Sequence, residues 1–452
     1  MKMLEKEPII QVGILSSEKI EFILNGSFTT PTGTIFSGNQ QAAIQDGKVW
    51  FDNQLFDELI LDPTTDDASF DLVDVVIGIG FHWERRETQR FRRAIKLIVD
   101  NGQLTVINRI KVEDYLTSVI SSEMSATASD ELLKAHAVIS RSWLLKPIIN
   151  HQVGTGRDLS MMKNNNNGNI RTSRDLSLRI EKYYERDTHT HFDVCADDHC
   201  QRYQGITRAS TAAVEKAIEA TRGETLMYNE QICDARFSKS CGGTSETFEN
   251  CWAPEHHPYL SKVIDNPTTP EGYELDLTVE VNAEKWIRES PEAFCNTSDK
   301  KILLQVLNIY DQETTDFYRW KVEYSQAELS EIICRRSGID FGEIVDLIPV
   351  KRGESSRIIE LKIVGTKQTV IVGKELEIRK WLSNSHLYSS AFVVVKSEIV
   401  NGIPQHFTLT GAGWGHGVGL CQIGAAVMGE KGYRYDEILL HYFKGAVLTR
   451  IY

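Results

Sequence analysis

The alternation of hydrophobic and polar positions predicts a strand-rich beginning to this chain. Short alternating patterns start at Ile10 and Lys19 and are bounded by Asn-Gly and Pro-Thr-Gly, which are turn signals. Further strand patterns cover residues 72–80 and 94–108. The sequence therefore predicts a β-rich N-terminal region over residues 1–104.

The hydrophobic period then becomes helical. Apolar residues recur at helical spacing over 112–120, and a second helical pattern runs from Ser129 or Asp130 to Pro147. We expect Glu123 at the end of the first helix, where the negative end of the helix dipole disfavours an ionised carboxylate and so suits a general acid. A surface glutamate is the plain alternative. Arg141, on the second helix, could pair with Glu123 or hold an anionic group of a substrate.

The segment from residue 189 to residue 200 holds two thiols and three imidazoles. Zinc takes such nitrogen and sulfur ligands in a tetrahedral arrangement, and four protein ligands would make the site structural rather than catalytic. The predicted ligands are His189, Cys195, His199 and Cys200, with His191 as the alternative to His189. A disulfide between Cys195 and Cys200, or two unconnected thiols, would also fit this spacing.

Two glycine-containing segments are candidates for contacting a substrate. Glycine occupies every second position from Gly411 to Gly419, so an extended strand would present one face of bare backbone to a ligand or to another chain segment. A tight crossing inside the core is the competing interpretation. Residues 237–246 combine hydroxyl groups with two glycines, which suits either a sugar-binding loop or an ordinary turn. The candidate substrate-binding residues are Ser238, Ser240, Gly242, Gly243, Gly415, His416, Gly417 and Gln422.

Composition excludes some classes of function. The chain of 452 residues has a formal net charge of −13, which argues against a general nucleic-acid binder. Its first ten residues lack the apolar run of a secretory signal, and its apolar runs are too short for a membrane span. The Asn-rich tract at 164–168 predicts a solvated inserted loop.

Five motifs, in order, resemble the SpoIID/LytB family. Residues 112–125 are similar to its LEDYLxGVVxSEMP segment, 133–143 to LKAQAVAARTY, 194–205 to its CQVYxG element and 238–252 to SxSGGxTExxExVW. Residues 411–442 resemble its glycine-rich ending. The resemblance implies an α+β fold with a SpoIID-like core, made of a helix pair and mixed or antiparallel strands, over 105–264 and 406–452. Between these segments the pattern of strands and short helices predicts an inserted α/β subdomain over 265–405. Ser125, Trp143 and Cys421 depart from the family's motifs.

The resemblance also implies a function, namely that of a peptidoglycan lytic transglycosylase. Such an enzyme cleaves between N-acetylmuramic acid and N-acetylglucosamine, on glycan strands poor in stem peptides, and leaves a 1,6-anhydro end. Glu123 matches the family's catalytic acid and base, and Arg141 matches its functionally important arginine. Some members bind zinc through a similar Cys/His cluster, and the family acts in the cell envelope, although the lack of a visible signal segment leaves the cytoplasm open.

Two other functions remain as alternatives. LytB relatives enhance a cell-wall amidase, so the chain could bind peptidoglycan or such an amidase without cutting glycan. A hydrolase is the weaker alternative, built either on a zinc ion at Cys195, His199 and Cys200 or on Cys241 as a nucleophile.

Overall fold

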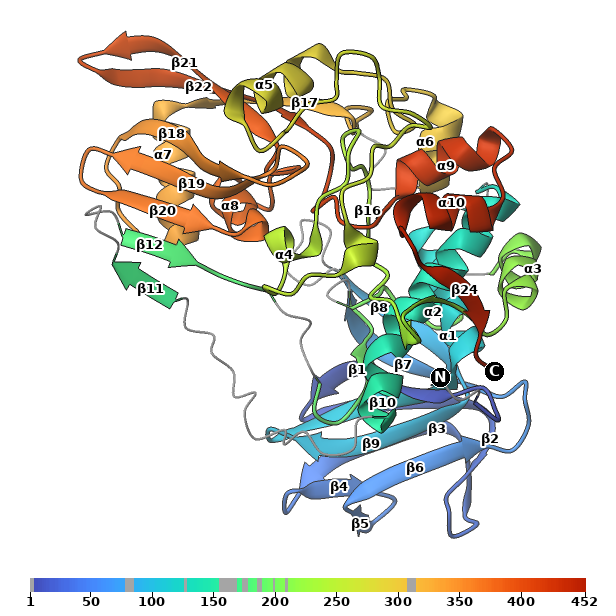
Figure 1. Ribbon diagram of the computed structural model, residues 1–452. Coiled ribbons are helices and arrows are strands. Elements are labelled where there is room, and N and C mark those ends of the chain that lie inside the picture. Colours follow the sequence, from blue (N-terminus) through green and yellow to red (C-terminus); the bar gives the residue numbers. More distant parts are fainter. Residues whose placement is uncertain are drawn as a thin grey trace. The chain divides into compact units, whose positions relative to one another are not determined.

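The computed structural model describes residues 4–77, 85–125, 128–153, 169–172, 178–184, 189–197, 200–207, 210–306 and 314–452 (Figure 1). The chain forms two compact units, each assembled from segments that are distant in sequence. Unit 1 consists of Met1–Ile148, Arg186–Thr225 and Thr449–Tyr452, and unit 2 consists of Ile149–Glu185 and Leu226–Leu448. The α+β class and the β-rich N-terminal region are confirmed. The predicted domain boundaries at 104, 264 and 405 stay a prediction. They follow sequence patterns and family motifs, whereas the two units are defined by contacts within the folded chain.

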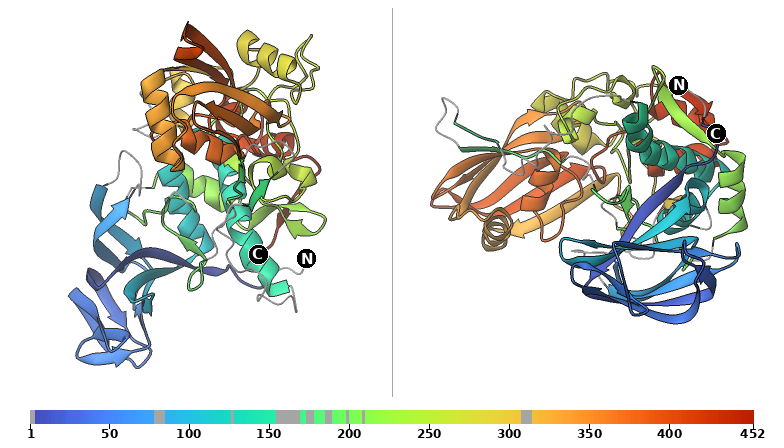
Figure 2. Two further views of the ribbon diagram at one scale, coloured as in Figure 1. Left: turned by 90° about the vertical axis from the view of Figure 1, so that its left-hand side faces the viewer. Right: turned by 90° about the horizontal axis from the view of Figure 1, so that it is seen from below.

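Unit 1 is organised around one large sheet, whose strands β1 to β10 are drawn in blue and cyan in Figures 1 and 2. Its main path runs β13-β1-β10-β9-β6-β2-β3-β4-β5, with β7 pairing to β2 and β8. These elements correspond to the predicted strand patterns. The alternation arises because one face of each strand is buried in the core, as the fully buried Val12 and Leu97 show. The strands are β1 (Ile9–Ser17), β2 (Lys19–Thr29), β3 (Ile35–Gln45), β4 (Lys48–Phe51), β5 (Gln54–Phe56), β6 (Glu58–Pro63), β7 (Ser69–Ile77), β8 (Arg85–Arg92), β9 (Ala94–Asp100), β10 (Gln103–Lys111) and β13 (Val194–Cys195).

The predicted helix pair follows this sheet directly. Helix α1 (Val112–Glu123) begins where β10 ends and buries the apolar face that its period predicts. Helix α2 (Asp130–Val153) passes through Pro147 instead of ending there, so the expected end of this helix is wrong. Proline removes one backbone hydrogen bond from a helix but does not prevent its continuation when the rest of the helix is held. Helix α3 (Ala212–Ala220) begins at Thr211, whose side chain accepts a hydrogen bond from the Val214 amide.

In the part of the chain that the structure describes, unit 2 contains sheets of five, three and two strands and most of the short helices. The sheet orders are β11-β12-β20-β19-β18, β17-β22-β21 and β16-β23. The strands are β11 (Asn169–Thr172), β12 (Leu178–Glu181), β16 (Phe237–Ser238), β17 (Arg319–Ser325), β18 (Ile344–Arg352), β19 (Ile358–Gly365), β20 (Thr369–Gly373), β21 (Phe392–Val400), β22 (Ile403–Ala412) and β23 (Leu420–Cys421). The helices are α4 (Phe248–Cys251), η2 (Pro258–Leu260), α5 (Glu280–Glu289), α6 (Lys300–Val306), α7 (Gln326–Ser337), α8 (Glu375–Trp381), α9 (Gln422–Glu430) and α10 (Tyr435–Tyr442). Strands β14 (Glu224–Tyr228), β15 (Gln231–Ile232) and β24 (Val447–Arg450) complete the chain.

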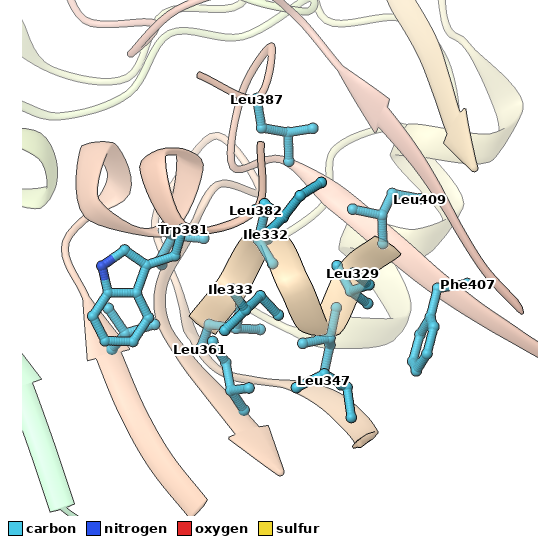
Figure 3. Close-up of a cluster of buried hydrophobic side chains, with 14 of the residues drawn as sticks. Leu329, Ile332, Ile333, Leu347, Leu361, Trp381, Leu382, Leu387, Phe407 and Leu409 are labelled. Carbon is cyan, nitrogen blue, oxygen red and sulfur yellow. The ribbon is translucent and has the colours of Figure 1, made fainter. Parts of the chain in front are cut away.

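The core of unit 2 lies where helices α7 and α8 pack against strands β18, β19, β20 and β22. Figure 3 shows Leu329 and Ile333 of α7 among Leu361, Trp381 and Leu409, all of them buried. Helix α7 begins at a Ser325 cap, whose side chain accepts a hydrogen bond from the Glu328 amide. Among the described residues, no helix is long and apolar enough to cross a membrane. The Asn-rich tract lies outside the described residues.

Candidate active site

The candidate catalytic carboxylate lies at the end of α1, as predicted. Glu123 is the last residue of the helix and is half-buried, and the final turn of α1 contains no basic residue. Its Oε1 atom lies 3.4 Å from the backbone nitrogen of Arg202, which donates to it. This bond is long, which is common for catalytic groups before a substrate is bound. Among the described residues, Glu123 therefore accepts this one long hydrogen bond, and its remaining lone pairs can accept from a further partner.

The segment that reaches Glu123 is held against both helices of the pair. The Gln204 amide donates to Ser118 Oγ of α1 at 3.2 Å, and the Tyr115 hydroxyl donates to Gln201 Oε1 at 3.3 Å. Gln201 Nε2 in turn donates to the Ser140 carbonyl of α2 at 3.4 Å. These bonds place the 201–204 segment, and therefore the Arg202 amide, relative to α1 and α2.

Arg141 is part of the core of unit 1. Its side chain is 0% exposed, with Nε donating to Glu113 Oε1 at 3.0 Å and Nη2 donating to Glu113 Oε2 at 2.6 Å. Of the two roles considered for Arg141, the structure therefore shows an ion pair with Glu113 in place of one with Glu123. Glu113 also accepts from the Gly223 amide at 3.0 Å and from the Tyr452 hydroxyl at 2.6 Å. A bidentate pair of this kind holds α2 to the start of α1.

Sequence reasoning missed Glu113 as the partner of Arg141. The partners are 28 positions apart and lie on different helices, so no helical spacing relates them. Glu113 occupies the first turn of α1, where an acidic residue is also explained by the helix dipole. Because the helix dipole already explains an acidic residue at this position, the sequence contains no signal that Glu113 pairs with Arg141.

The predicted Cys/His cluster is assembled in the structure. Ligand atoms of His189, Cys195 and Cys200 all lie within 4.8 Å of one another, and the three side chains are half-buried. Strand β13 pairs in parallel with β1, with Cys195 opposite Gly13, which anchors one end of this segment to the sheet. His191 instead lies 3.5 Å from Asp100, so the structure brings His189 to the thiols.

This donor set fits a zinc ion. One imidazole and two thiols are ligands of the type that zinc prefers, and a fourth is needed to close a tetrahedral site. His199, the predicted fourth ligand, lies outside the described residues. Among the described residues, no cysteine forms a disulfide, so the alternative of a bond between Cys195 and Cys200 is not supported.

Of the two interpretations of the glycine segment, the structure supports the tight crossing inside the core, because residues 413–419 do not run as one extended strand. Gly413, Gly415, Gly417 and Gly419 have φ angles of 77°, 94°, 77° and 74°, in the region that favours glycine. A Cβ atom on Gly417 would lie 2.4 Å from the Arg357 guanidinium, and one on Gly419 would lie 2.1 Å from the Arg236 carbonyl. The glycines therefore permit tight packing within unit 2, and the expected bare face is covered by the chain itself.

The two glycine-containing segments pack against each other. Strands β16 and β23 pair in parallel with Ser238 opposite Cys421, and Ser240 bridges to Trp414. A Cβ atom on Gly242 would lie 2.8 Å from the Gly413 nitrogen, so the two backbones cross at glycines. Six of the candidate substrate-binding residues are buried by this packing: Ser238, Ser240, Gly242, Gly243, Gly417 and Gln422. Contact with a substrate stays a prediction, most directly for the half-buried Gly415 and His416.

His416 is held in its neutral form. Burial, together with the nearby cations Arg236 and Arg357, lowers the pKa of its imidazole well below the usual value. Its Nδ1 atom accepts a hydrogen bond from the Val418 amide at 3.0 Å. His416 is therefore suited to orienting a neighbouring group rather than to exchanging protons near neutral pH.

Cys241 does not have the environment of a nucleophile. Its side chain is 2% exposed, and burial raises the pKa of its thiol well above the usual value. A nucleophilic cysteine needs a stabilised thiolate that a substrate can reach. The cysteine-hydrolase alternative therefore has no support in this structure.

Unit 1 thus combines a half-buried glutamate at the end of the first of two helices with a Cys/His cluster, and the Arg202 amide that donates to this glutamate follows Cys200 by two positions. Residues 100–228 match the family described as stage II sporulation protein, and this match confirms the resemblance to the SpoIID/LytB family over that part of the chain. Residues 246–419 match a second family, described as a domain of unknown function (DUF8618).

Three curated proteins are similar to this chain over about half of its length or more. It is 23% identical over 349 residues to stage II sporulation protein D of Bacillus subtilis, covering 76% of each chain. It is 25% identical over 352 residues to an uncharacterized protein of Brachyspira hyodysenteriae, covering 78% of this chain and 70% of that one. It is 23% identical over 246 residues to the amidase enhancer of Bacillus subtilis, a match that covers 52% of this chain and only 32% of the enhancer.

Proposed function

We propose that this protein is a lytic transglycosylase that cleaves peptidoglycan between N-acetylmuramic acid and N-acetylglucosamine. The observation that carries the proposal is Glu123, a half-buried carboxylate at the end of α1 within the residues that match the stage II sporulation protein family. The family match supports a cell-wall-related role. The proposed place of action is the cell envelope, on strands poor in stem peptides.

The chemistry requires only one carboxyl group. Hydrolysing glycosidases use two, because one of them must activate water or attack the sugar carbon. In the proposed reaction Glu123 gives its proton to the leaving glycosidic oxygen as the bond from C1 breaks. The 6-hydroxyl of the same N-acetylmuramic acid then attacks C1 and passes its proton to Glu123. The products are a 1,6-anhydro end and a free 4-hydroxyl, and Glu123 is protonated again.

Neighbouring groups of unit 1 position the carboxylate. The Glu113 and Arg141 pair holds the two helices together, with Arg141 too buried to touch a glycan. Zinc at His189, Cys195 and Cys200 would fix the backbone just before Arg202, whose amide faces Glu123. In this proposal zinc supplies rigidity, and Glu123 transfers the protons.

A product assay tests this proposal. Purified protein is mixed with glycan strands stripped of stem peptides, and released fragments are identified by mass spectrometry. We expect anhydro ends, and we expect Glu123→Gln to lower their rate of formation by about 10²- to 10⁴-fold, the range for losing a general acid and base. Glu219→Gln, on the exposed face of α3, is the matched control and should keep full activity. Products with ordinary reducing ends would contradict transglycosylation.

The match to an amidase enhancer favours a second candidate, a non-catalytic module. In that case the chain would bind peptidoglycan or a cell-wall amidase and raise the rate of the amidase. Glycan binding without products, equal in the wild type and in Glu123→Gln, would identify this function. The same two proteins added to a cell-wall amidase would then accelerate it equally.

A further inference from the structure

A second group of metal-ligating side chains lies inside unit 2, far in sequence from the Cys/His cluster. It consists of Cys241, Asp265, Cys295 and Cys421, whose ligand atoms all lie within 4.8 Å of one another. All four residues are buried, with exposed fractions of at most 2%. They come from the loop after β16, the chain after η2, the loop before α6 and strand β23. Four separate segments of unit 2 therefore converge on one point.

The spacing of the sulfur atoms fits two ligands of one ion. The Sγ atoms of Cys241 and Cys295 are 3.7 Å apart. Two thiolates at about 2.3 Å from a tetrahedral zinc ion are separated by about 3.8 Å. A disulfide would require a separation of about 2.05 Å. Two thiols joined by a weak hydrogen bond could also have the observed separation, so the other groups around the cluster must be considered.

Hydrogen bonds orient the ligands of this cluster. The Cys241 amide donates to Cys421 Sγ at 3.2 Å, and the Cys295 amide donates to Asp265 Oδ2 at 2.8 Å. The Tyr442 hydroxyl donates to Asp265 Oδ1 at 2.5 Å. Outer donors of this kind fix the direction of metal ligands and stabilise their anionic forms. Each carboxylate oxygen still has a lone pair for a metal.

Two guanidinium groups adjoin the loop that carries Cys241. Arg357 donates to the Cys241 carbonyl at 3.2 Å, and Arg319 donates to the Gly242 carbonyl at 3.1 Å. In the part of the chain that the structure describes, neither arginine forms an ion pair with a carboxylate, although Ser355 links Arg357 to the buried Glu246. A buried cation is stabilised by a nearby negative charge. Three thiolates and a carboxylate around a divalent ion would supply that charge.

We propose that Cys241, Asp265, Cys295 and Cys421 form a structural site for a zinc ion in unit 2. Four protein ligands close the coordination shell, so the ion holds chain segments together and leaves no position for a substrate. Binding displaces the protons of the three thiols to solvent, and the ion takes their place. The site is independent of the proposed transglycosylase reaction and of the Cys/His cluster in unit 1.

The test uses the full chain with the unit 1 cluster removed. The double variant Cys195→Ser/Cys200→Ser is purified in reductant, and its metal is measured by elemental mass spectrometry. We expect one zinc ion per chain, and we expect its replacement by cobalt(II) to give the absorption of a tetrahedral thiolate site. Adding Cys295→Ser should remove the ion, and adding Asp265→Asn should weaken its binding at least tenfold. Adding Cys334→Ser, at an exposed cysteine, should change nothing.

Two results would overturn the proposal. One is a folded double variant that takes up neither zinc nor cobalt while all its remaining thiols react after denaturation. The other is two thiols missing from that titration and restored by reductant, which would show a disulfide between Cys241 and Cys295. If the Cys295→Ser protein fails to fold, the cobalt spectrum of the double variant still decides between these outcomes.

Discussion

The two thiol clusters of this protein are built in opposite ways. In unit 1 the ligands belong to one short segment, with His189 and Cys200 only 11 positions apart, and they are half-buried. In unit 2 the ligands Cys241 and Cys421 are 180 positions apart and fully enclosed. A local cluster can form early and exchange its ion with solvent, whereas a long-range cluster exists only once the surrounding unit has folded. The same chemistry can therefore hold a loop in one unit and a whole core in the other.

Two buried arginines, one in each unit, also have different partners. Arg141 in unit 1 has a carboxylate partner, Glu113, with which it forms a bidentate pair. Arg357 in unit 2 donates to the carbonyls of Gly415 and Cys241 and to the Ser355 hydroxyl. Removing Glu113 leaves the Arg141 charge buried, whereas removing Arg357 leaves neutral oxygen acceptors without a donor.

The largest difference that we expect concerns metal exchange. With zinc in both clusters, a chelator should empty the unit 1 cluster about 10²-fold faster or more, because a buried site must open locally before its ion can leave. Zinc release is followed with an indicator dye, and the Cys195→Ser/Cys200→Ser variant should lack the fast phase. Two phases of equal rate would remove the contrast between the clusters.

Breaking the charge pair of unit 1 should have the largest effect on stability. Glu113→Gln leaves the Arg141 guanidinium buried without a countercharge, at a cost of about 3–5 kcal/mol in the free energy of unfolding. Urea unfolding measures this change. The control is Glu323→Gln, which breaks an exposed ion pair with Lys321 and should cost less than about 1 kcal/mol. Equal losses in the two variants would show that the buried pair is not special.

Removing the unit 2 arginine should cost less. Arg357→Met leaves the Gly415 and Cys241 carbonyls without these donors, at about 1–3 kcal/mol. A Cβ on Gly417 would collide with this guanidinium, so the combination with Gly417→Ala gives a sharper result. Gly417→Ala should be less destabilising in the Arg357→Met background than in the wild type. Additive losses in this double-mutant cycle would contradict the observed packing.

The smallest expected effect is a pH dependence located in unit 2. Burial, together with Arg379, Lys380 and Arg336, lowers the pKa of His386 from 6.5 to about 4. Between pH 6.5 and pH 4 the imidazole of His386 therefore binds a proton more readily in the unfolded chain than in the folded one. The contribution of His386 to the stability of the fold is full above pH 6.5 and declines as the pH falls toward 4.

Between pH 7 and pH 4.5 we expect the wild type to lose about 1–2 kcal/mol more unfolding free energy than His386→Gln. This is less than the full pKa shift of His386 would give, because the side chain keeps some exposure to solvent. Unfolding free energies of the two proteins at pH 7 and pH 4.5 give the difference. A pH dependence that is the same in both proteins would show that His386 does not titrate as described.

Much of unit 1 could be predicted because its signals are local. The alternation that predicts the strands and the helical period that ends at Glu123 both depend on neighbouring residues. The Cys/His cluster was also visible, since His189 and Cys200 occupy one short segment. The end of α2 was wrong because Pro147 is a local stop signal that surrounding structure can override.

The glycine segment shows where local reasoning fails. Alternate glycines suit both an extended strand and a series of turns with positive φ, and the sequence favoured neither. The packing of Arg357 and Arg236 against Gly417 and Gly419 decided between them. Contacts across more than fifty positions are needed to see this, and the sequence pattern contains none of them.

By itself, then, the sequence determined the strand-rich beginning and the helix pair with Glu123 at its end. It also predicted the short-range Cys/His cluster and showed the resemblance to the SpoIID/LytB family. The tertiary structure alone paired Arg141 with Glu113, buried the glycine segment and gathered Cys241, Asp265, Cys295 and Cys421 at one point. The physical reason is the range of the interactions. Periodicity and capping act between residues a few positions apart, whereas buried charge pairs and metal sites depend on which distant segments the folded core brings together.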